Sequence, residues 1–348
     1  MDLLERLTQT PAIAGCEHRL RDLITAEASD LFDDVRTDAL GSLICRRDPR
    51  PRNASGKKRK PLSVMLAAHM DQIGFLVRHI DDKGFLRVNA VGGFDTRNLF
   101  ARLVTVCTQK GDIPGVMNPS GRPLHIASDE ERKKSPEIHD LVIDTGMTAD
   151  RVSKQVRIGD MVVIQAPFSR VGDTVTAQAL DNRVACWIAI RAMQRVKHHD
   201  CEIYCVFTVQ EEVGLRGAGT AAYSIRPDVG IAVDTTLCVD LPGVPEDQRV
   251  TQMGAGAAMT VMDAGAIADR DLLASFEKTA KKKKIKTQRS IMPRGATDAG
   301  TIQRAGSGTR TFTLSCPTRY IHTITEMVHL DDLHACRDLL AAYLAQVQ

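Results

Sequence analysis

The chain contains 348 residues, which at about 150 residues per domain predicts roughly two domains. Hydrophobic residues make up 43% and charged residues 26%, and no stretch approaches the ~18 consecutive apolar residues that a membrane span requires. The net charge is +3 with both signs interspersed, so the sequence excludes a membrane-spanning protein and offers no basic surface for nucleic acid. Nine cysteines without a CxxC pair, and a start without a secretory pattern, predict a cytoplasmic protein with reduced thiols.

The first part of the chain predicts a helix, two short strands and a buried strand. Apolar residues between 17 and 32 have helical spacing, and residues 35–47 read as two short strands around a turn. Residues 49–60 are rich in Pro, Gly, Ser and basic residues, which predicts a surface loop. The run LSVMLAAHMD at 62–71 predicts a strand buried on both faces that ends abruptly in polar residues.

The middle of the chain has a different texture from its two ends. Between residues 74 and 167, short alternating strands and turn signals dominate, whereas helices and strands alternate again after 167. We therefore expect an α/β fold, a mixed sheet flanked by helices, with an inserted mostly-β domain. The expected division is residues 1–71 and 168–348 for the α/β domain and 72–167 for the insertion. The KKKK run at 281–284 is expected at the exposed C-terminal end of a helix.

Polar side chains of metal-ligand types follow several of the predicted strands. Ligands of α/β proteins bind at the carboxyl ends of the strands, so residues in these places are candidates for a functional site. The candidates are His69, Asp71, Asp181, Glu211, Glu212, Asp234 and His322. Two imidazoles with several carboxylates suit borderline divalent ions such as zinc, cobalt or manganese, and they do not suit a closed thiolate site. The sequence predicts a site for two divalent ions that hydrolyses an amide bond.

The adjacent residues Glu211 and Glu212 are expected to have different roles. Neighbouring residues in extended or turning backbone point in different directions, so one carboxylate can bind metal while the other stays free. The free carboxylate would then act as a general base.

The motifs AHMDQIGF, ALDNR, EEVGLRGA, DTT and PTRYIHT occur in this order along nearly the whole chain. Together they resemble the dinuclear-metal aminopeptidases that assemble into tetrahedral dodecamers, the glutamyl and leucyl aminopeptidases once also labelled endoglucanases. The resemblance implies a zinc-peptidase-like α/β domain with a PDZ-related, barrel-like domain inserted after the first metal-binding histidine and serving in assembly. It also implies peptide substrates with a free N-terminus and a homo-oligomer, a dodecamer built from dimers.

The resemblance assigns a role to each candidate residue. Two divalent ions, zinc or cobalt with manganese as a further choice, would share Asp181 as a bridging ligand. The other ligands would be His69 and Asp234 on one ion and Glu212 and His322 on the other. Glu211 would be the general base, and Asp71 would orient the imidazole of His69. Gln72 stands where this family more often has an acid, which removes no ligand.

Several alternatives stay open from the sequence alone. The same ligands would serve a related co-catalytic metallohydrolase, such as an N-acyl amino acid deacylase or a carboxypeptidase-like enzyme, and a non-catalytic self-assembling protein is a remote third reading. The preferred N-terminal residue and the native metal are not determined by these residues. Asp298 in GATDAG has two interpretations, a residue at a helix N-terminus or a residue near the substrate.

Overall fold

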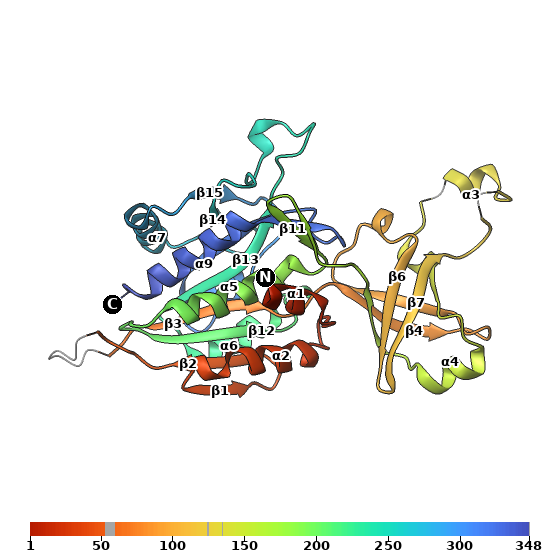
Figure 1. Ribbon diagram of the computed structural model, residues 1–348, viewed down its shortest axis with the longest axis horizontal. Helices are drawn as coiled ribbons and strands as arrows, with labels where there is room; N and C mark the ends of the chain where they lie inside the picture. The colour runs from red at the N-terminus through yellow and green to blue at the C-terminus, as the bar shows by residue number, and fades with distance from the viewer. Residues whose placement is uncertain (53–59, 124, 134, 348) are drawn as a thin grey trace.

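The computed structural model describes residues 1–52, 60–123, 125–133 and 135–347. The chain forms two bodies, a large mixed sheet with helices on both faces and a smaller β-barrel (Figure 1). This architecture confirms the expected α/β fold with a mostly-β insertion. Of the surface loop expected at 49–60, residues 53–59 lie outside the described residues. No helix in the described ranges is long and apolar enough to span a membrane.

The large sheet is built around four adjacent parallel strands. Their order is β12 (Glu202–Thr208), β3 (Ser63–His69), β13 (Val229–Leu237) and β16 (Arg310–Arg319). Because these strands are parallel, their carboxyl ends lie at one edge of the sheet. Antiparallel strands extend the sheet on both sides: β2 (Leu43–Arg47) and β1 (Asp34–Thr37) beyond β12, and β17 (Glu326–His329), β11 (Thr174–Ala177) and β10 (Ser169–Val171) beyond β16, with β14 (Ala257–Met262) and β15 (Thr287–Ile291) branching from β16.

Helices cover both faces of this sheet because its central strands are apolar on both sides. In β3, Val64, Leu66 and Ala68 face the main core, while Met65 and Ala67 face a smaller core on the other side. The main core is completed by α1 (Asp2–Gln9), α2 (His18–Ala28), α5 (Leu180–Arg195), α7 (Arg270–Lys283) and α9 (Leu330–Leu344), and the smaller one by α6 (Arg216–Ile225) and α8 (Ala299–Gln303).

The smaller body is a closed barrel in which every pair of neighbouring strands is antiparallel. Closure leaves the barrel without an unpaired edge strand. Its interior is filled by apolar side chains such as Phe75, Val104 and Ile143. The strand order is β4 (Gly74–Ile80), β5 (Leu86–Val91), β8 (Leu141–Asp144), β7 (Gly111–Pro119), β6 (Arg102–Thr108) and β9 (Met161–Ile164), and the helices of this segment are α3 (Asp129–Lys133) and α4 (Ala149–Gln155).

The barrel contacts the N-terminal segment of the chain directly. The Arg19 guanidinium donates two hydrogen bonds of 2.8 Å to the carboxylate of Asp112 in β7. Ile13 packs in a cluster with Met161 of β9. Gly74, at the start of β4, has no room for a side chain, since an added Cβ would lie 2.9 Å from the carbonyl oxygen of Val162 and would clash with Ile13. These contacts hold the barrel against the edge of the sheet where β3 ends.

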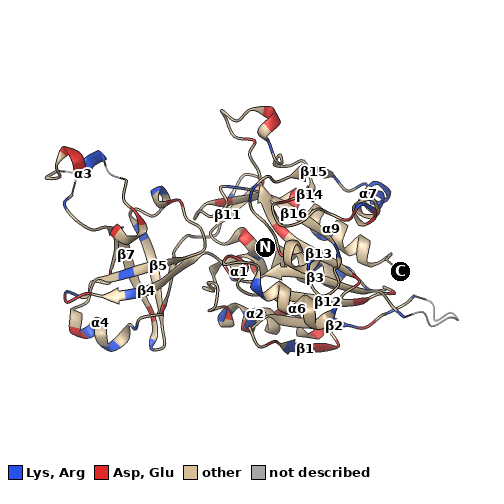
Figure 2. Cartoon of the chain, turned by 180° about the vertical axis from the view of Figure 1, so that it is seen from behind, with Lys and Arg blue, Asp and Glu red and all other residues tan. Residues whose placement is uncertain are grey.

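Local sequence signals explain the ends of α7. Asp269 caps the N-terminus by accepting a hydrogen bond of 2.8 Å from the backbone N–H of Leu272. Lys281, Lys282 and Lys283 occupy the last turn, where cations interact favourably with the helix dipole. All three are exposed, and basic residues are prominent at α7 in Figure 2. The lysine run is thus a solvated helix end, as its sequence predicts.

Candidate metal centre

The carboxyl ends of the central strands bring the predicted candidates together. His69 is the last residue of β3, and Glu211 and Glu212 follow β12. Asp234 lies within β13, which continues to Leu237, so it is not at a strand end as its sequence context suggests. Asp181 lies in the first turn of α5, and His322 lies between β16 and β17. Segments far apart in sequence therefore meet at one edge of the sheet.

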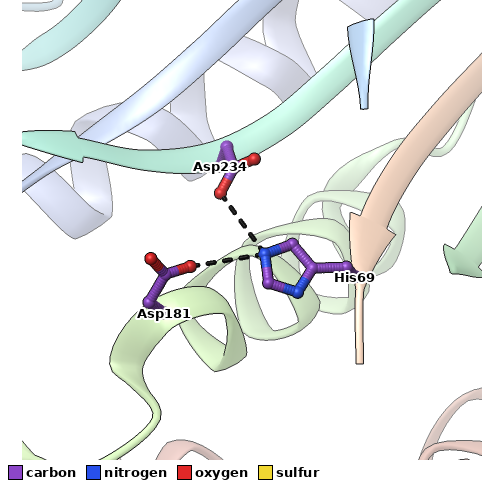
Figure 3. A group of neighbouring side chains, drawn as sticks. All are labelled: His69, Asp181 and Asp234. Carbon is purple, nitrogen blue, oxygen red and sulfur yellow. Dashed lines mark ion pairs between the residues drawn. The ribbon is translucent and has the colours of Figure 1, made fainter. Parts of the chain in front are cut away.

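The first group of donors surrounds His69 (Figure 3). The His69 Nε2 atom lies 3.3 Å from Oδ1 of Asp181 and 3.7 Å from Oδ1 of Asp234. All three residues are buried. The Nδ1 atom of the ring lies 3.0 Å from the backbone oxygen of Asp71, which can only accept, so Nδ1–H donates in this contact.

The second group shares Asp181 with the first. The His322 Nε2 atom lies 3.3 Å from Oε2 of Glu212 and 3.7 Å from Oδ2 of Asp181. The two oxygens of Asp181 thus face two different imidazoles, Oδ1 toward His69 and Oδ2 toward His322. Within each group, one donor atom per residue lies within 4.8 Å of the other two. This is the arrangement expected of a carboxylate that bridges two neighbouring ions.

The donor set fits divalent metal ions in type and spacing. A tetrahedral zinc ion with bonds of ~2.0–2.1 Å places its ligand atoms roughly 3.3 Å apart, close to the shorter separations in both groups. Each group contains one imidazole and two carboxylates, ligands that zinc, cobalt and manganese accept. The carboxylates of Asp181, Glu212 and Asp234 are almost completely buried. Burying so much negative charge costs free energy unless cations compensate it.

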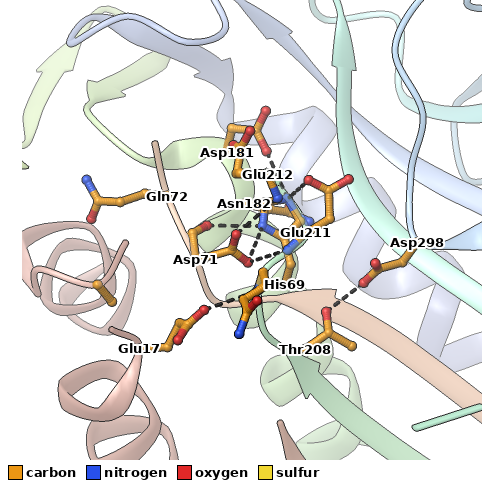
Figure 4. Close-up of polar contacts among 12 residues, drawn as sticks. Glu17, His69, Asp71, Gln72, Asp181, Asn182, Thr208, Glu211, Glu212 and Asp298 are labelled. Atoms are coloured by element: carbon orange, nitrogen blue, oxygen red, sulfur yellow. Dashed lines mark hydrogen bonds and ion pairs between the residues drawn. The ribbon is translucent and has the colours of Figure 1, made fainter. Parts of the chain in front are cut away.

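The Asp71 side chain contacts both His69 and the turn that carries the two glutamates (Figure 4). The backbone N–H groups of Glu211 and Glu212 each donate a hydrogen bond of 3.0 Å to its carboxylate, one to Oδ1 and one to Oδ2. Its Oδ1 atom lies 3.5 Å from Nδ1 of His69, farther than the backbone oxygen of the same residue. The fully buried Asp71 carboxylate therefore fixes the turn that presents both glutamates.

Glu211 lies inside the cluster, with its carboxylate close to the His69 ring. Its Oε2 atom lies 3.8 Å from Nε2 of His69. Burial, with the negative charges of Asp234, Asp298 and Glu212, raises the pKa of Glu211 well above its ordinary value. An elevated pKa brings a carboxylate closer to the range in which it can both accept and return a proton at neutral pH.

Asp298 is a buried acid at the start of α8. It stands at the N-terminus of α8 but makes no side-chain capping bond there. Instead, the Thr208 hydroxyl donates a hydrogen bond of 2.6 Å to its Oδ2 atom, as drawn in Figure 4. Burial raises the pKa of Asp298 to about 6. The interpretation of Asp298 as a residue at a helix N-terminus is confirmed, although its side chain turns to Thr208 and does not cap the helix. Its place near the substrate stays a prediction.

Two further buried acids support the centre and were not among the sequence candidates. Glu326 accepts hydrogen bonds from the backbone N–H groups of Asp181 and His322. Glu17 accepts one of 3.1 Å from the backbone N–H of Gln210, next to Glu211. Each of these acids binds one backbone N–H group that is far away in the chain, so no local sequence pattern marks it.

A cavity opens beside the second group of donors. Asp181, Glu212 and His322 contribute to its lining. The barrel side contributes Phe94, Asn98, Leu99 and Ile164 to its wall. The cavity therefore lies between the two bodies and gives a substrate access to the polar cluster.

Comparison with known proteins identifies the family. The family model described as M42 glutamyl aminopeptidase matches residues 52–339. The chain belongs to the M42 aminopeptidase family. It is 32% identical over 355 residues to a lysyl aminopeptidase of Pyrococcus furiosus, covering 100% of this chain and 97% of that protein. The resemblance carried by the motifs is thereby confirmed, and the chain is a metallo-aminopeptidase, a hydrolase of peptide bonds.

Solved structures of M42-like aminopeptidases match the whole fold. An aminopeptidase from the archaeon Desulfurococcus kamchatkensis superposes with a TM-score of 0.92 at 35% identity, covering 99% of this chain and 94% of that one. The Pyrococcus horikoshii TET1 peptidase, which can assemble into a tetrahedron or a large octahedral shell, gives a TM-score of 0.86 at 33% identity with 99% of both chains covered. At least one structural relative of this M42 aminopeptidase thus forms large assemblies.

Proposed function

We propose that this M42 aminopeptidase uses a dinuclear metal site to remove the N-terminal residue from peptides. His69, Asp181 and Asp234 would hold one ion, and Asp181, Glu212 and His322 the other. The observation that carries the proposal is the Asp181 carboxylate, whose two oxygens face different imidazoles at 3.3 and 3.7 Å. A residue that served only to pair with one histidine would not need this orientation.

Zinc or cobalt would suit these ligands best, and manganese is also compatible with them. When bound, two such ions polarise a carbonyl oxygen and lower the pKa of water toward ~7. The chain supplies the remaining functions through its own side chains.

Glu211 is the general base in this proposal. It would take the proton from the attacking water and deliver it to the leaving amine as the peptide bond breaks. Its burial, its raised pKa and its place 3.8 Å from the His69 ring support this role. Asp71 would hold the Glu211 backbone in place through the hydrogen bond from its N–H group. Loss of the base is expected to lower the rate by about 10²–10⁴-fold.

The substrate would enter through the cavity beside Glu212 and His322. Its partly apolar wall, with Phe94, Leu99 and Ile164, suits peptide side chains. The ligand set alone is compatible with an N-acyl amino acid deacylase or a carboxypeptidase-like enzyme, and family membership supports the aminopeptidase.

Initial rates on paired substrates test this function. Glutamyl, lysyl and leucyl anilides, each with a free amine or an acetylated one, would be offered to the enzyme supplied with zinc or cobalt. We expect cleavage of free-amine substrates and refusal of their acetylated partners. Turnover of the acetylated substrates alone would favour the deacylase, and turnover of neither would favour a non-catalytic assembling protein.

We also propose that residues 72–167 form an assembly domain and that residues 1–71 and 168–348 form the catalytic domain. Leu103 and Val116, opposite each other on β6 and β7, are 60% and 41% exposed, which supports a protein contact on the outside of the barrel. The assembled form would be a cytoplasmic dodecamer built from dimers, and the dodecameric structure of PhTET1 supports the number of twelve chains. Light scattering on the purified protein should give the mass of twelve chains, and a monomer would contradict the assembly proposal.

A further inference from the structure

Glu326 holds two segments of the metal centre with a single carboxylate. Its Oε1 atom accepts a hydrogen bond of 2.8 Å from the backbone N–H of His322, and its Oε2 atom accepts one of 2.9 Å from the backbone N–H of Asp181. The residue begins β17 and is only 2% exposed. Both oxygens are therefore engaged, and each engages the backbone of a different proposed ligand.

The two segments that Glu326 holds have unusual backbone conformations. His322 and Tyr320 have φ angles of 63° and 59°, and Ala179, two residues before Asp181, has a φ angle of 56°. Non-glycine residues are strained in this left-handed region and stay there only where surrounding contacts hold them. Hydrogen bonds donated to a buried carboxylate are contacts of this kind.

The supporting bonds are distributed unequally between the two proposed ions. For the group Asp181, Glu212 and His322, every ligand has its backbone N–H bound to a buried carboxylate, either Glu326 or Asp71. For the group containing His69 and Asp234, the corresponding bonds among the described residues reach only the shared Asp181. Disturbing Glu326 should therefore affect one ion more than the other.

We propose that Glu326 is a positioning residue that sets the affinity and spacing of the ion held by Asp181, Glu212 and His322. This inference rests on the proposed metal site. Glu326 does not contact the ion in this account. It acts by fixing where the Asp181 carboxylate and the His322 ring begin, and residues of this kind typically change metal affinity by about 10–100-fold.

The substitution Glu326→Gln isolates this role. Gln has nearly the same size but one acceptor oxygen and one NH₂ donor, so its donor would face one of the two backbone N–H groups. One hydrogen bond is lost while the buried volume is retained. Glu326→Asp is a second variant, because it keeps two acceptor oxygens on a side chain one methylene shorter that cannot span both segments.

Asp332 offers a matched control within the same chain. It is fully buried, and its two oxygens accept hydrogen bonds of 2.7 Å from the backbone N–H groups of Gly254 and Gly256. It has no contact with any proposed ligand among these bonds. Asp332→Asn therefore disrupts the same kind of paired hydrogen bonds at a site away from the metal centre. The comparison separates a general loss of stability from a specific effect on metal binding.

The test is a titration of each metal-free full-length variant with Zn²⁺ against a chromophoric chelator, with thermal unfolding as the check that the variant is folded. Asp332→Asn should bind each of the two ions with the same affinity as wild type. Glu326→Gln should bind one ion about 10–100-fold more weakly and the other within roughly threefold of wild type. If Glu326→Gln does not fold, Glu326→Asp carries the same comparison.

Three outcomes would count against this reasoning in distinguishable ways. Equal affinities in the wild type and the Glu326 variants would overturn the positioning role. An equal loss in Asp332→Asn would also overturn it, because the effect would then be general. A wild-type protein that binds no pair of ions would instead refute the proposed metal site itself.

Discussion

Arg183 is the largest fully buried side chain among the described residues, and its replacement should destabilise the fold strongly. Its Nη1 atom donates to the backbone oxygens of Leu7 at 2.9 Å and Thr10 at 3.2 Å. Its Nη2 atom donates to the backbone oxygen of Ala12 at 3.2 Å and to Oε1 of Gln72 at 2.9 Å. The guanidinium thus ties the N-terminal segment to the chain just after His69.

The size of the effect follows from the groups left behind. Burial lowers the pKa of Arg183 to about 10, so the side chain remains a cation at neutral pH. In Arg183→Leu, the three backbone oxygens and one amide oxygen lose their donors, and each unsatisfied buried group costs ~1–3 kcal/mol before water and relaxation relieve part of it. We expect the free energy of unfolding to fall by about 4 kcal/mol, as when one partner of a buried charged network is removed.

Urea unfolding of the metal-free protein measures this change, with the shift in midpoint converted through the wild-type slope. The unfolding midpoint of Arg183→Lys should lie between those of wild type and Arg183→Leu, since lysine keeps the charge but lacks the planar set of donors. Arg97→Ala is the control, because the pair between Arg97 and Asp95 is largely exposed, and it should leave the midpoint unchanged. A loss below about 1 kcal/mol in Arg183→Leu would refute the idea that this network holds the N-terminal segment.

Two other changes have definite expected outcomes. Gly256 has a φ of 98°, and an added Cβ would clash with the backbone carbonyl of Lys286, so Gly256→Ala should lower the free energy of unfolding by roughly 2–3 kcal/mol in the same urea assay; a neutral effect would contradict the packing described. The Arg319 guanidinium, with burial opposing it, holds the pKa of Asp240 well below its usual range. The stabilisation by this pair is therefore present above the unfolded pKa of ~3.9 and is lost as the pH falls further toward the folded pKa. The free energy of unfolding of wild type should exceed that of Asp240→Asn by roughly 1–2 kcal/mol at pH 7, and this difference should shrink below about pH 4. A difference that stays constant with pH would contradict this linkage between protonation and stability.

The long elements of the α/β body were predictable because their periodicity is strong. The buried strand β3 and the helices α5 and α9 agree with the apolar patterns at their positions. The helix α6 was not predicted, because its glycines read as turn signals. Gly217 is needed for packing instead, since an added Cβ would lie 2.6 Å from the carbonyl oxygen of Val209. A helix packed closely against a strand end requires glycine and other small residues, and turns are rich in the same residue types, so the sequence does not distinguish the two.

The barrel shows a different limit of sequence interpretation. Its short strands and turns are visible between residues 74 and 167, but the order β4-β5-β8-β7-β6-β9 is not. Closure depends on pairings such as Phe75 with Val162, which join the first and last strands of the insertion. Nothing in either segment alone specifies that partner.

The candidate site was predictable where a side chain is itself the expected ligand. His69, Asp181 and His322 have residue types that suggest metal binding, and the fold brings them together. Glu326 was missed because its function depends on two backbone N–H groups, one of them 145 residues away in the chain. Positioning groups of this kind become visible only when the hydrogen bonds are known.

The central proposal is a two-metal aminopeptidase with Glu211 as its base, and one comparison tests it most directly. Metal content and initial rates on a free-amine aminoacyl anilide would be measured for wild type, Glu211→Gln and Glu212→Gln. The account predicts two ions per wild-type chain, a Glu211→Gln enzyme that keeps both ions but is about 10²–10⁴-fold slower, and a Glu212→Gln enzyme that loses an ion. A wild-type chain without two ions, or a metal-loaded Glu211→Gln enzyme as fast as wild type, would contradict it.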